Sequence, residues 1–185
     1  MSITGSNVDS WVNEMARLAS RFVAGFEDVY GYPPGEHYVL RSTDDSGRDA
    51  LAAVLSGAGV RDLIEFYSHV SRISFPDVGP GFFVDEAECV VAGVRGAQPT
   101  RLSGVPGRTV VVFGSDGGGA LFAVDRQTGE VVRLEGGSLI GDAYVVGEYG
   151  VQVIARDFEG FMRFLSAELQ RQVPSGRQPS CSRPS

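Results

Sequence analysis

Residues 111–124 read VVFGSDGGGALFAV, and they contain the most informative fold pattern of this chain. Two runs of β-favouring residues flank a loop, residues 114–119, that contains four glycines. Glycine adopts at low cost the positive φ angles that tight turns need, so the pattern predicts a β-hairpin in which strand 109–113 pairs with strand 120–124. We interpret Gly114, Gly117 and Gly119 as structural residues of this loop, and we expect Gly119 to need a positive φ.

Further strand signals lie on both sides of this hairpin. The loop 125–129 leads to a third β-favouring run, residues 130–134, and so predicts a second hairpin. Residues 144–146 and 151–155 are expected to form two more strands, the latter because of its β-branched residues. A short apolar strand is expected upstream at residues 82–84.

Helical periodicity fills the rest of the chain. An apolar stripe at helical spacing predicts a helix over about residues 8–28, and further helices are expected at 49–55, 60–70, 85–96 and 157–169. We expect Asp157 to cap the last helix, Asp45 or Ser46 to cap the second, and Asp85 with Glu88 to form a capping box. The sequence therefore predicts an α+β fold whose mainly antiparallel sheet is flanked by helices.

Length and composition favour one globular domain. The chain has 185 residues, of which 43% are hydrophobic and 21% charged, a balance typical of a protein that folds around one core. We place this domain at residues 1–173. Residues 174–185 consist of Pro, Ser, Gly, Arg, Gln and one Cys, and we expect a disordered tail there.

The charge disfavours nucleic acid as a partner. The formal charge is −7, but three of the 16 arginines lie after residue 170, so residues 1–170 carry 13 arginines against 23 acids, a charge of −10. Such a surface repels a phosphate backbone and attracts a basic protein. No apolar run is long enough to cross a bilayer and residues 1–10 lack a signal-peptide pattern, so we expect no membrane contact and a cytoplasmic location.

Several kinds of catalytic or metal site lack their sequence pattern. The glycine-rich loop has no lysine and precedes a strand, unlike a phosphate-binding loop, and Ser115 has Phe113 where a nucleophile elbow needs glycine. His37 and His69 have no metal-ligand spacing. Cys89 is expected to be a buried apolar residue, and Cys181 an inert residue of the tail. We therefore expect no catalytic residue, metal or cofactor.

Two pairs of nearby carboxylates are acid–base candidates by residue type. Asp44 with Asp45, and Glu86 with Glu88, would need to converge in a pocket to act in general acid–base catalysis. Glu86 and Glu88 lie in the first turn of an expected helix and interact favourably with its dipole, so we interpret them as capping residues rather than catalytic ones.

The ordered combination of motifs resembles the SUKH superfamily, which includes bacterial toxin-immunity proteins and a fungal cell-wall signalling regulator. The similarity is carried by residues 111–124, by Gly129, Glu130 and Val131, and by the closing segment 155–165, ARDFEGFMRFL. Residues 63–67, LIEFY, are similar to the family's helix before its first sheet segment. The resemblance covers about residues 60–169, so we divide the domain into an N-terminal helical extension, 1–59, and a family-like core, 60–173.

This resemblance implies a function as well as a fold. It implies an α+β domain without catalytic residues that binds a toxin domain and covers its active surface. A signalling or scaffold domain of the same fold is one alternative, and a small-molecule-binding enzyme is another. The toxin and the oligomeric state stay open.

Five acids are the candidate partner-binding residues. They are expected in loops or at strand ends of the sheet, where recognition residues often lie, and they would attract a basic partner. These candidates are Asp116, Asp125, Glu135, Asp142 and Glu148.

Overall fold

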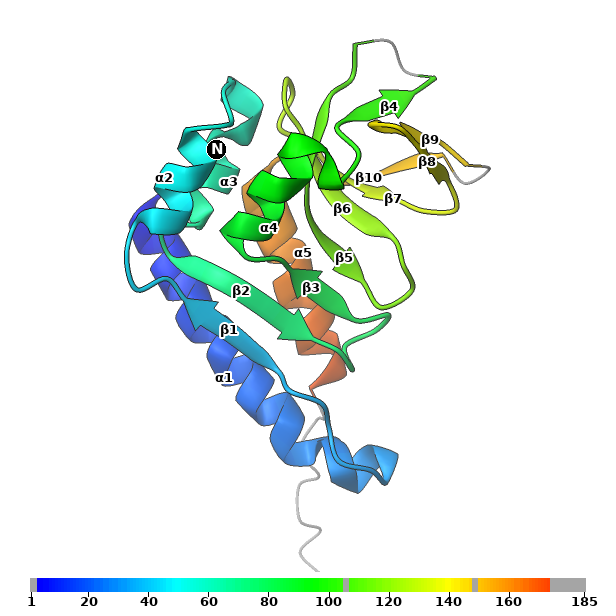
Figure 1. Cartoon of the computed structure of the whole chain (residues 1–185). Helices are drawn as coiled ribbons and strands as arrows, with labels where there is room; N and C mark the ends of the chain where they lie inside the picture. Colours follow the sequence, from blue (N-terminus) through cyan, green and yellow to red (C-terminus); the bar gives the residue numbers. More distant parts are fainter. Residues whose placement is uncertain (1–2, 105–106, 148–149, 174–185) are drawn as a thin grey trace, which may run out of the picture.

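The computed structural model describes residues 3–104, 107–147 and 150–173. Seven strands form an antiparallel sheet in the order β1-β2-β3-β5-β6-β7-β10, and three short strands form a second sheet in the order β4-β9-β8 (Figure 1). The α+β fold with a mainly antiparallel sheet is thereby confirmed. The predicted tail, 174–185, lies outside the described residues.

The bounds of the strands are as follows. The large sheet contains β1 (Tyr38–Arg41), β2 (Val70–Phe75), β3 (Phe82–Val84), β5 (Val110–Asp116), β6 (Leu121–Asp125), β7 (Val131–Leu134) and β10 (Val151–Ala155). The small sheet contains β4 (Arg101–Ser103), β8 (Ser138–Ile140) and β9 (Ala143–Val145), and β4 runs parallel to β9.

The helices are α1 (Gly5–Tyr30), α2 (Ser46–Ala52), α3 (Arg61–Phe66), α4 (Ala87–Ala92) and α5 (Phe158–Gln172). One turn of 3₁₀-helix, Ala58–Val60, precedes α3, and a wide turn, Gly93–Ala97, follows α4. Helices α1 and α5 lie against each other behind the sheet, whereas α2, α3 and α4 gather at its upper end (Figure 1).

Two hydrophobic clusters hold these layers together. On one face of the sheet, Phe113 of β5 packs against Phe158 and Phe161 of α5, with ring centroids 5.3 and 5.0 Å apart. This larger cluster also includes the buried stripe of α1. The opposite face of β5, β6 and β7 packs against Leu102 and Tyr144 of the small sheet. Each strand of the hairpins thus buries both faces, as its apolar run requires.

The first helix belongs to this core. Its stripe from Val8 to Phe26 is buried, and Trp11 Nε1 donates hydrogen bonds to Met162 O at 3.0 Å and Ser166 Oγ at 2.7 Å on α5. Gly31 ends the helix with φ 78°. Residues 1–59 contribute strand β1 as well as helices, so this part of the chain is more than a helical extension.

Several expected helix boundaries are wrong. The helix expected over 60–70 ends at Phe66, and Val70 begins β2, which pairs with β1 and β3. The helix expected over 49–55 begins earlier, at Ser46, and Asp45 makes no side-chain capping bond. The expected capping box is absent because Glu86 is the N-cap residue of α4 and makes no side-chain capping bond, while Asp85 N donates to Phe113 O at 2.9 Å.

Two other expectations meet opposite outcomes. Cys89 is exposed on α4, so the prediction that it is buried is wrong. Asp157 caps α5 as expected, because its Oδ1 accepts a hydrogen bond from Gly160 N at 2.7 Å.

The three glycines have different structural roles. Gly114 lies within β5 rather than in the loop, and a Cβ there would meet Phe83 O at 2.2 Å. A Cβ on Gly117 would meet Pro80 O at 2.3 Å. Gly119 has φ 90°, which confirms the expected positive φ, and the space around it is open.

Replacing Gly119 by valine is expected to lower the free energy of unfolding by about 1–3 kcal/mol, the usual cost of a strained backbone conformation. The cost is conformational, because an added Cβ at Gly119 meets no atom within 4 Å. Urea unfolding of Gly119→Val, compared with Gly118→Ala in the same turn, measures it. A Gly119→Val variant as stable as the parent protein would contradict this reason.

Candidate functional site

Asp116 is an internal turn residue. It is buried, and its Oδ1 accepts hydrogen bonds from Gly118 N and Ala120 N, both at 2.9 Å. Its Oδ2 accepts a hydrogen bond from Arg133 Nη2 at 2.6 Å. The expectation that Asp116 is displayed to a partner is therefore wrong: its carboxylate holds the β5–β6 hairpin together and pairs with an arginine of β7.

Asp125 has the same role at the other end of β6. It is buried, its Oδ1 accepts from Gln127 N and Thr128 N at 2.8 and 3.0 Å, and its Oδ2 accepts from Arg108 Nε at 2.7 Å. Burial alone would raise the pKa of Asp125, but the two backbone hydrogen bonds and Arg108 outweigh it and lower that pKa. The expectation of an exposed binding acid is wrong here too.

The other three candidates do not join them on one surface. Glu135 is partly exposed and pairs with Arg133, and Asp142 is half-exposed and accepts a hydrogen bond from Arg101 Nε at 2.8 Å. That hydrogen bond is the main cause of the lowered pKa of Asp142. Glu148 lies outside the described residues. Each described candidate thus has an arginine that offsets its charge.

A different group of acids lines a cleft of about 240 Å³ beside α4. Asp44, from the β1–α2 connection, lies on this cleft with Glu86 and Glu88 from the start of α4. Hydroxyl side chains complete the polar lining: Ser42, Thr43, Ser46 and Ser71. We name the site formed by these seven residues the acidic cleft.

Hydrogen bonds fix one wall of the acidic cleft. Ser42 N donates to His69 O at 3.0 Å and Ser42 Oγ donates to Tyr67 O at 2.8 Å. Asp44 Oδ1 accepts from Ser46 N at 2.9 Å, and Ser46 lowers the pKa of this carboxyl group. The connection between β1 and α2 is therefore held in place without a regular secondary structure.

The floor of the cleft includes the buried Tyr67. Its hydroxyl donates to Asp85 O at 2.6 Å. Burial, reinforced by the carboxylates of Asp85 and Glu88, raises the pKa of Tyr67, so this group stays a neutral hydrogen-bond donor. Burial also raises the pKa of Asp85, against the opposing effect of Arg72.

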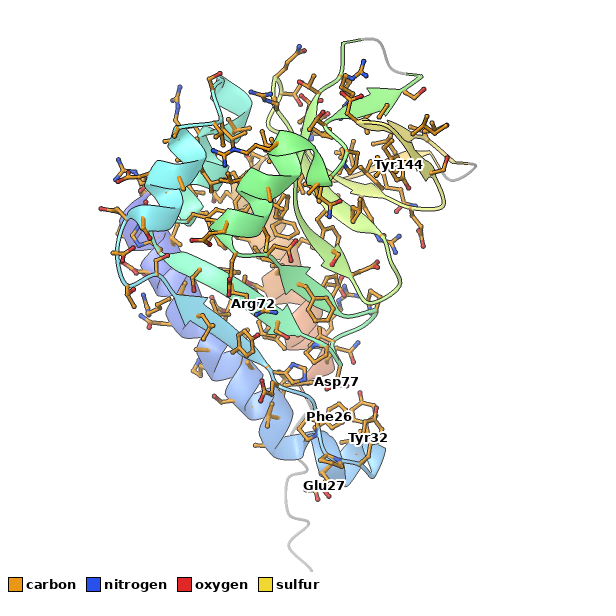
Figure 2. All side chains as sticks on the ribbon, in the orientation of Figure 1. Phe26, Glu27, Tyr32, Arg72, Asp77 and Tyr144 are labelled. Atoms are coloured by element: carbon orange, nitrogen blue, oxygen red, sulfur yellow. The ribbon has the colours of Figure 1, made fainter. Side chains whose placement is uncertain are left out.

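Acids outnumber available cations around the acidic cleft. Arg72, on β2 (Figure 2), lies 3.7 Å from Glu86, and both side chains are about half exposed. Within the described residues, Glu88 has no ion-pair partner within 4.0 Å. The cleft therefore has unneutralised negative charge, in contrast to the acids of the hairpins.

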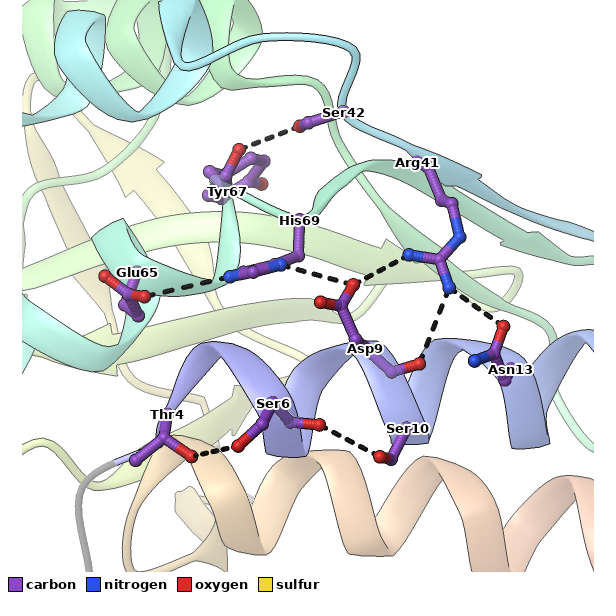
Figure 3. Close-up of polar contacts among 10 residues, drawn as sticks. All are labelled: Thr4, Ser6, Asp9, Ser10, Asn13, Arg41, Ser42, Glu65, Tyr67 and His69. Atoms are coloured by element: carbon purple, nitrogen blue, oxygen red, sulfur yellow. Dashed lines mark hydrogen bonds and ion pairs between the residues drawn. The ribbon is translucent and has the colours of Figure 1, made fainter.

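Arg41 lines the acidic cleft, but its charge is directed to α1. Its guanidinium donates to Asp9 Oδ1 at 2.8 Å and to Asn13 Oδ1 at 2.9 Å (Figure 3). Asp9 also lies 3.4 Å from His69, whose other ring nitrogen lies 3.7 Å from Glu65. The hydrogen bond from Arg41 is the main cause of the lowered pKa of Asp9.

The described residues lack a metal cluster and a membrane-spanning helix. Within the described ranges, no group of three or more His, Cys, Asp or Glu side chains is arranged to hold a metal ion. No described helix is both long and apolar enough to cross a membrane.

Sequence reasoning missed the acidic cleft because its acids are far apart in the chain. Asp44 and the pair Glu86 and Glu88 were each recognised as carboxylates, but only the pairing of β1 with β2 and the packing of α2 against α4 bring them together. Searches of protein-family models, curated proteins and solved structures found no match to the chain.

Proposed function

We propose that this chain is a non-enzymatic protein-binding domain, an immunity protein that binds and neutralises a bacterial toxin of the polymorphic or contact-dependent kind in the cytoplasm. The resemblance of residues 60–169 to the SUKH superfamily supports this proposal. The net charge of the chain supports it as well, since an acidic protein attracts a cationic toxin domain.

The observation that carries the proposal is the acidic cleft. A lysine or arginine of the partner would find Asp44, Glu86 and Glu88 around one concave site, with serine and threonine hydroxyls as further hydrogen-bond acceptors. Charge-assisted hydrogen bonds of this kind are stronger than those between neutral groups. The partly exposed Glu135 and Asp142 are secondary candidates, because each is already paired with an arginine.

Two alternatives would use the same surface differently. A signalling or scaffold domain would bind a protein other than a toxin through the cleft. A toxin gene beside the gene for this chain would favour the immunity function over this alternative. A small-molecule-binding enzyme is the less favoured alternative, and a metabolite-binding screen that reports on Tyr67 and Asp85 would identify it.

The test is charge reversal at the acidic cleft. In Glu86→Lys/Glu88→Lys, association with a cognate toxin domain is expected to slow at least tenfold at low salt, and the salt dependence of the association rate should weaken. Growth rescue on co-expression with the toxin should fall in parallel. The melting temperature should change little, because both residues are exposed and the Glu86–Arg72 ion pair that the change removes is between half-exposed side chains.

Glu135→Lys/Asp142→Lys is the matched control, since it reverses two acids that lie next to β7 and β9 and do not line the acidic cleft. A slower association in this control, with an unchanged rate in the cleft variant, would place the binding surface on the sheet. Unchanged association in both variants would refute an electrostatic interface at either surface.

A further inference from the structure

Strand β1 is one edge of the large sheet. It pairs with β2 through residues Tyr38 to Arg41, and within the described part of the chain no strand pairs with its outer side. An edge strand directs the N–H and C=O groups of alternate residues away from its neighbour. These groups can bind the backbone of another extended segment.

The main chain just before and within this edge is accessible. The side chain of His37 is fully buried, although the residue as a whole is partly exposed, so its exposed atoms are main-chain atoms. Tyr38 and Val39 are partly exposed as well, and Leu40 is 45% exposed. The edge therefore presents both backbone groups and apolar side chains to solvent.

A groove of about 290 Å³ follows this edge. One wall is the α1 face formed by Ala16, Ser20 and Val23, and the other is formed by residues 37–39. Ala16 and Ser20 are small and exposed, so they leave room above the helix. Ser20 Oγ donates a hydrogen bond to Ala16 O at 2.9 Å, so the hydroxyl proton of Ser20 is already bonded within the helix. We name this site the edge groove.

The buried side chain of His37 joins β1 to α1 and to the connection between β2 and β3. Its Nε2 lies 2.8 Å from Asp77 Oδ2, and its ring packs against Phe22 with centroids 5.0 Å apart. Its Nδ1 is buried and has no hydrogen-bond partner among the described residues. The His37 side chain has no exposed surface, so this nitrogen lies inside the packing between β1 and α1 and is out of reach of a segment in the groove.

The edge groove and the acidic cleft lie at opposite ends of the same strand. His37 and Val39 line the groove, whereas Arg41, the last residue of β1, lines the cleft. A strand rises about 3.3 Å per residue, so an added strand of five or six residues covers this distance. One extended segment can therefore contact both sites.

We propose that β1 accepts an extended segment of the partner protein as an additional strand, with small apolar side chains over Ala16 and Ser20 and a lysine or arginine at the end that reaches the acidic cleft. Strand addition of this kind gains affinity from main-chain hydrogen bonds and specificity from alternate side chains. The lysine or arginine of the partner segment rests on the proposed function, whereas the addition of a strand rests only on the free edge of β1 and the edge groove.

The experiment selects a random twelve-residue peptide library displayed on phage against the whole chain. Selected peptides are expected to alternate small apolar residues and to carry a basic residue near one end. They should shift the backbone amide signals of residues 38–41 in NMR spectra. Ser20→Trp should weaken their binding at least tenfold by filling the edge groove, whereas Arg21→Trp, on the exposed opposite flank of α1, should not.

The outcomes separate this inference from the proposed function. Selected peptides that leave the amides of residues 38–41 unshifted, or that bind Ser20→Trp and Arg21→Trp equally, would overturn strand addition even if toxin binding through the acidic cleft is observed. Concentration-dependent dimerisation of the free chain that shifts the same amides would assign the edge to a second copy and would also overturn it. Loss of peptide binding in Glu86→Lys/Glu88→Lys would support the basic residue at the cleft.

Discussion

Replacing Gly114 by alanine is expected to lower the free energy of unfolding by about 3 kcal/mol or more, at the upper end of overpacking costs. A Cβ at this position would lie 2.2 Å from Phe83 O and 3.3 Å from Val84 Cα, both on β3. Gly114 pairs directly with Val84 in the antiparallel ladder. The obstacle is main chain, so no side-chain rotation relieves it, and β3 must separate from β5.

Urea unfolding measures this loss, and Gly118→Ala is the matched control. A Cβ on Gly118 would meet only the Asp116 side chain, at 3.3 Å, so its cost should stay below about 1 kcal/mol. The exchange rates of the β3 amides should also rise in Gly114→Ala, because the pairing of β3 with β5 weakens. Equal stability of the two variants would contradict the close approach of these strands.

Local signals in the sequence predicted the parts of the fold that local interactions determine. The stripe from Trp11 to Phe26 indicated α1, and the turn residues of the two hairpins indicated β5, β6 and β7. Strands β1 and β4 lacked such a signal. Each is short and pairs with a strand that is distant in the chain: β1 pairs with β2, and β4 pairs with β9 of the small sheet. Pairing across such distances cannot be read from periodicity.

The acids of the hairpins were misassigned for a similar reason. The composition of a turn that contains Asp and Gly predicts that the Asp side chain is exposed. In a tight turn, however, that side chain also accepts hydrogen bonds from the backbone amides that follow it. Asp116 and Asp125 both do this. The turn sequences contained that signal, but the arginines that complete the burial, Arg133 and Arg108, come from other strands or loops.

The second large effect is expected where Asp116 and Arg133 pair. In Arg133→Met the Asp116 carboxylate would keep its two backbone hydrogen bonds but lose its cation, while its side chain stays fully buried. Removing one partner of a buried ion pair costs about 3–5 kcal/mol, and we expect the lower end because Arg133 itself is 21% exposed.

Arg101→Met is the matched control, because it breaks an ion pair of similar geometry whose two side chains are about half exposed. Exposed ion pairs contribute less than about 1 kcal/mol, so the control should cost correspondingly little in urea unfolding. The double variant Asp116→Asn/Arg133→Met should recover part of the loss, since the amide removes the unpaired charge while its oxygen still accepts from the turn amides. Equal losses in Arg133→Met and Arg101→Met, or no recovery in the double variant, would contradict the burial of an Asp116 charge. The strand order explains why the effect should be large. Strand β6 lies between β5 and β7, and the contact of Arg133 with Asp116 joins the two outer strands of this meander directly.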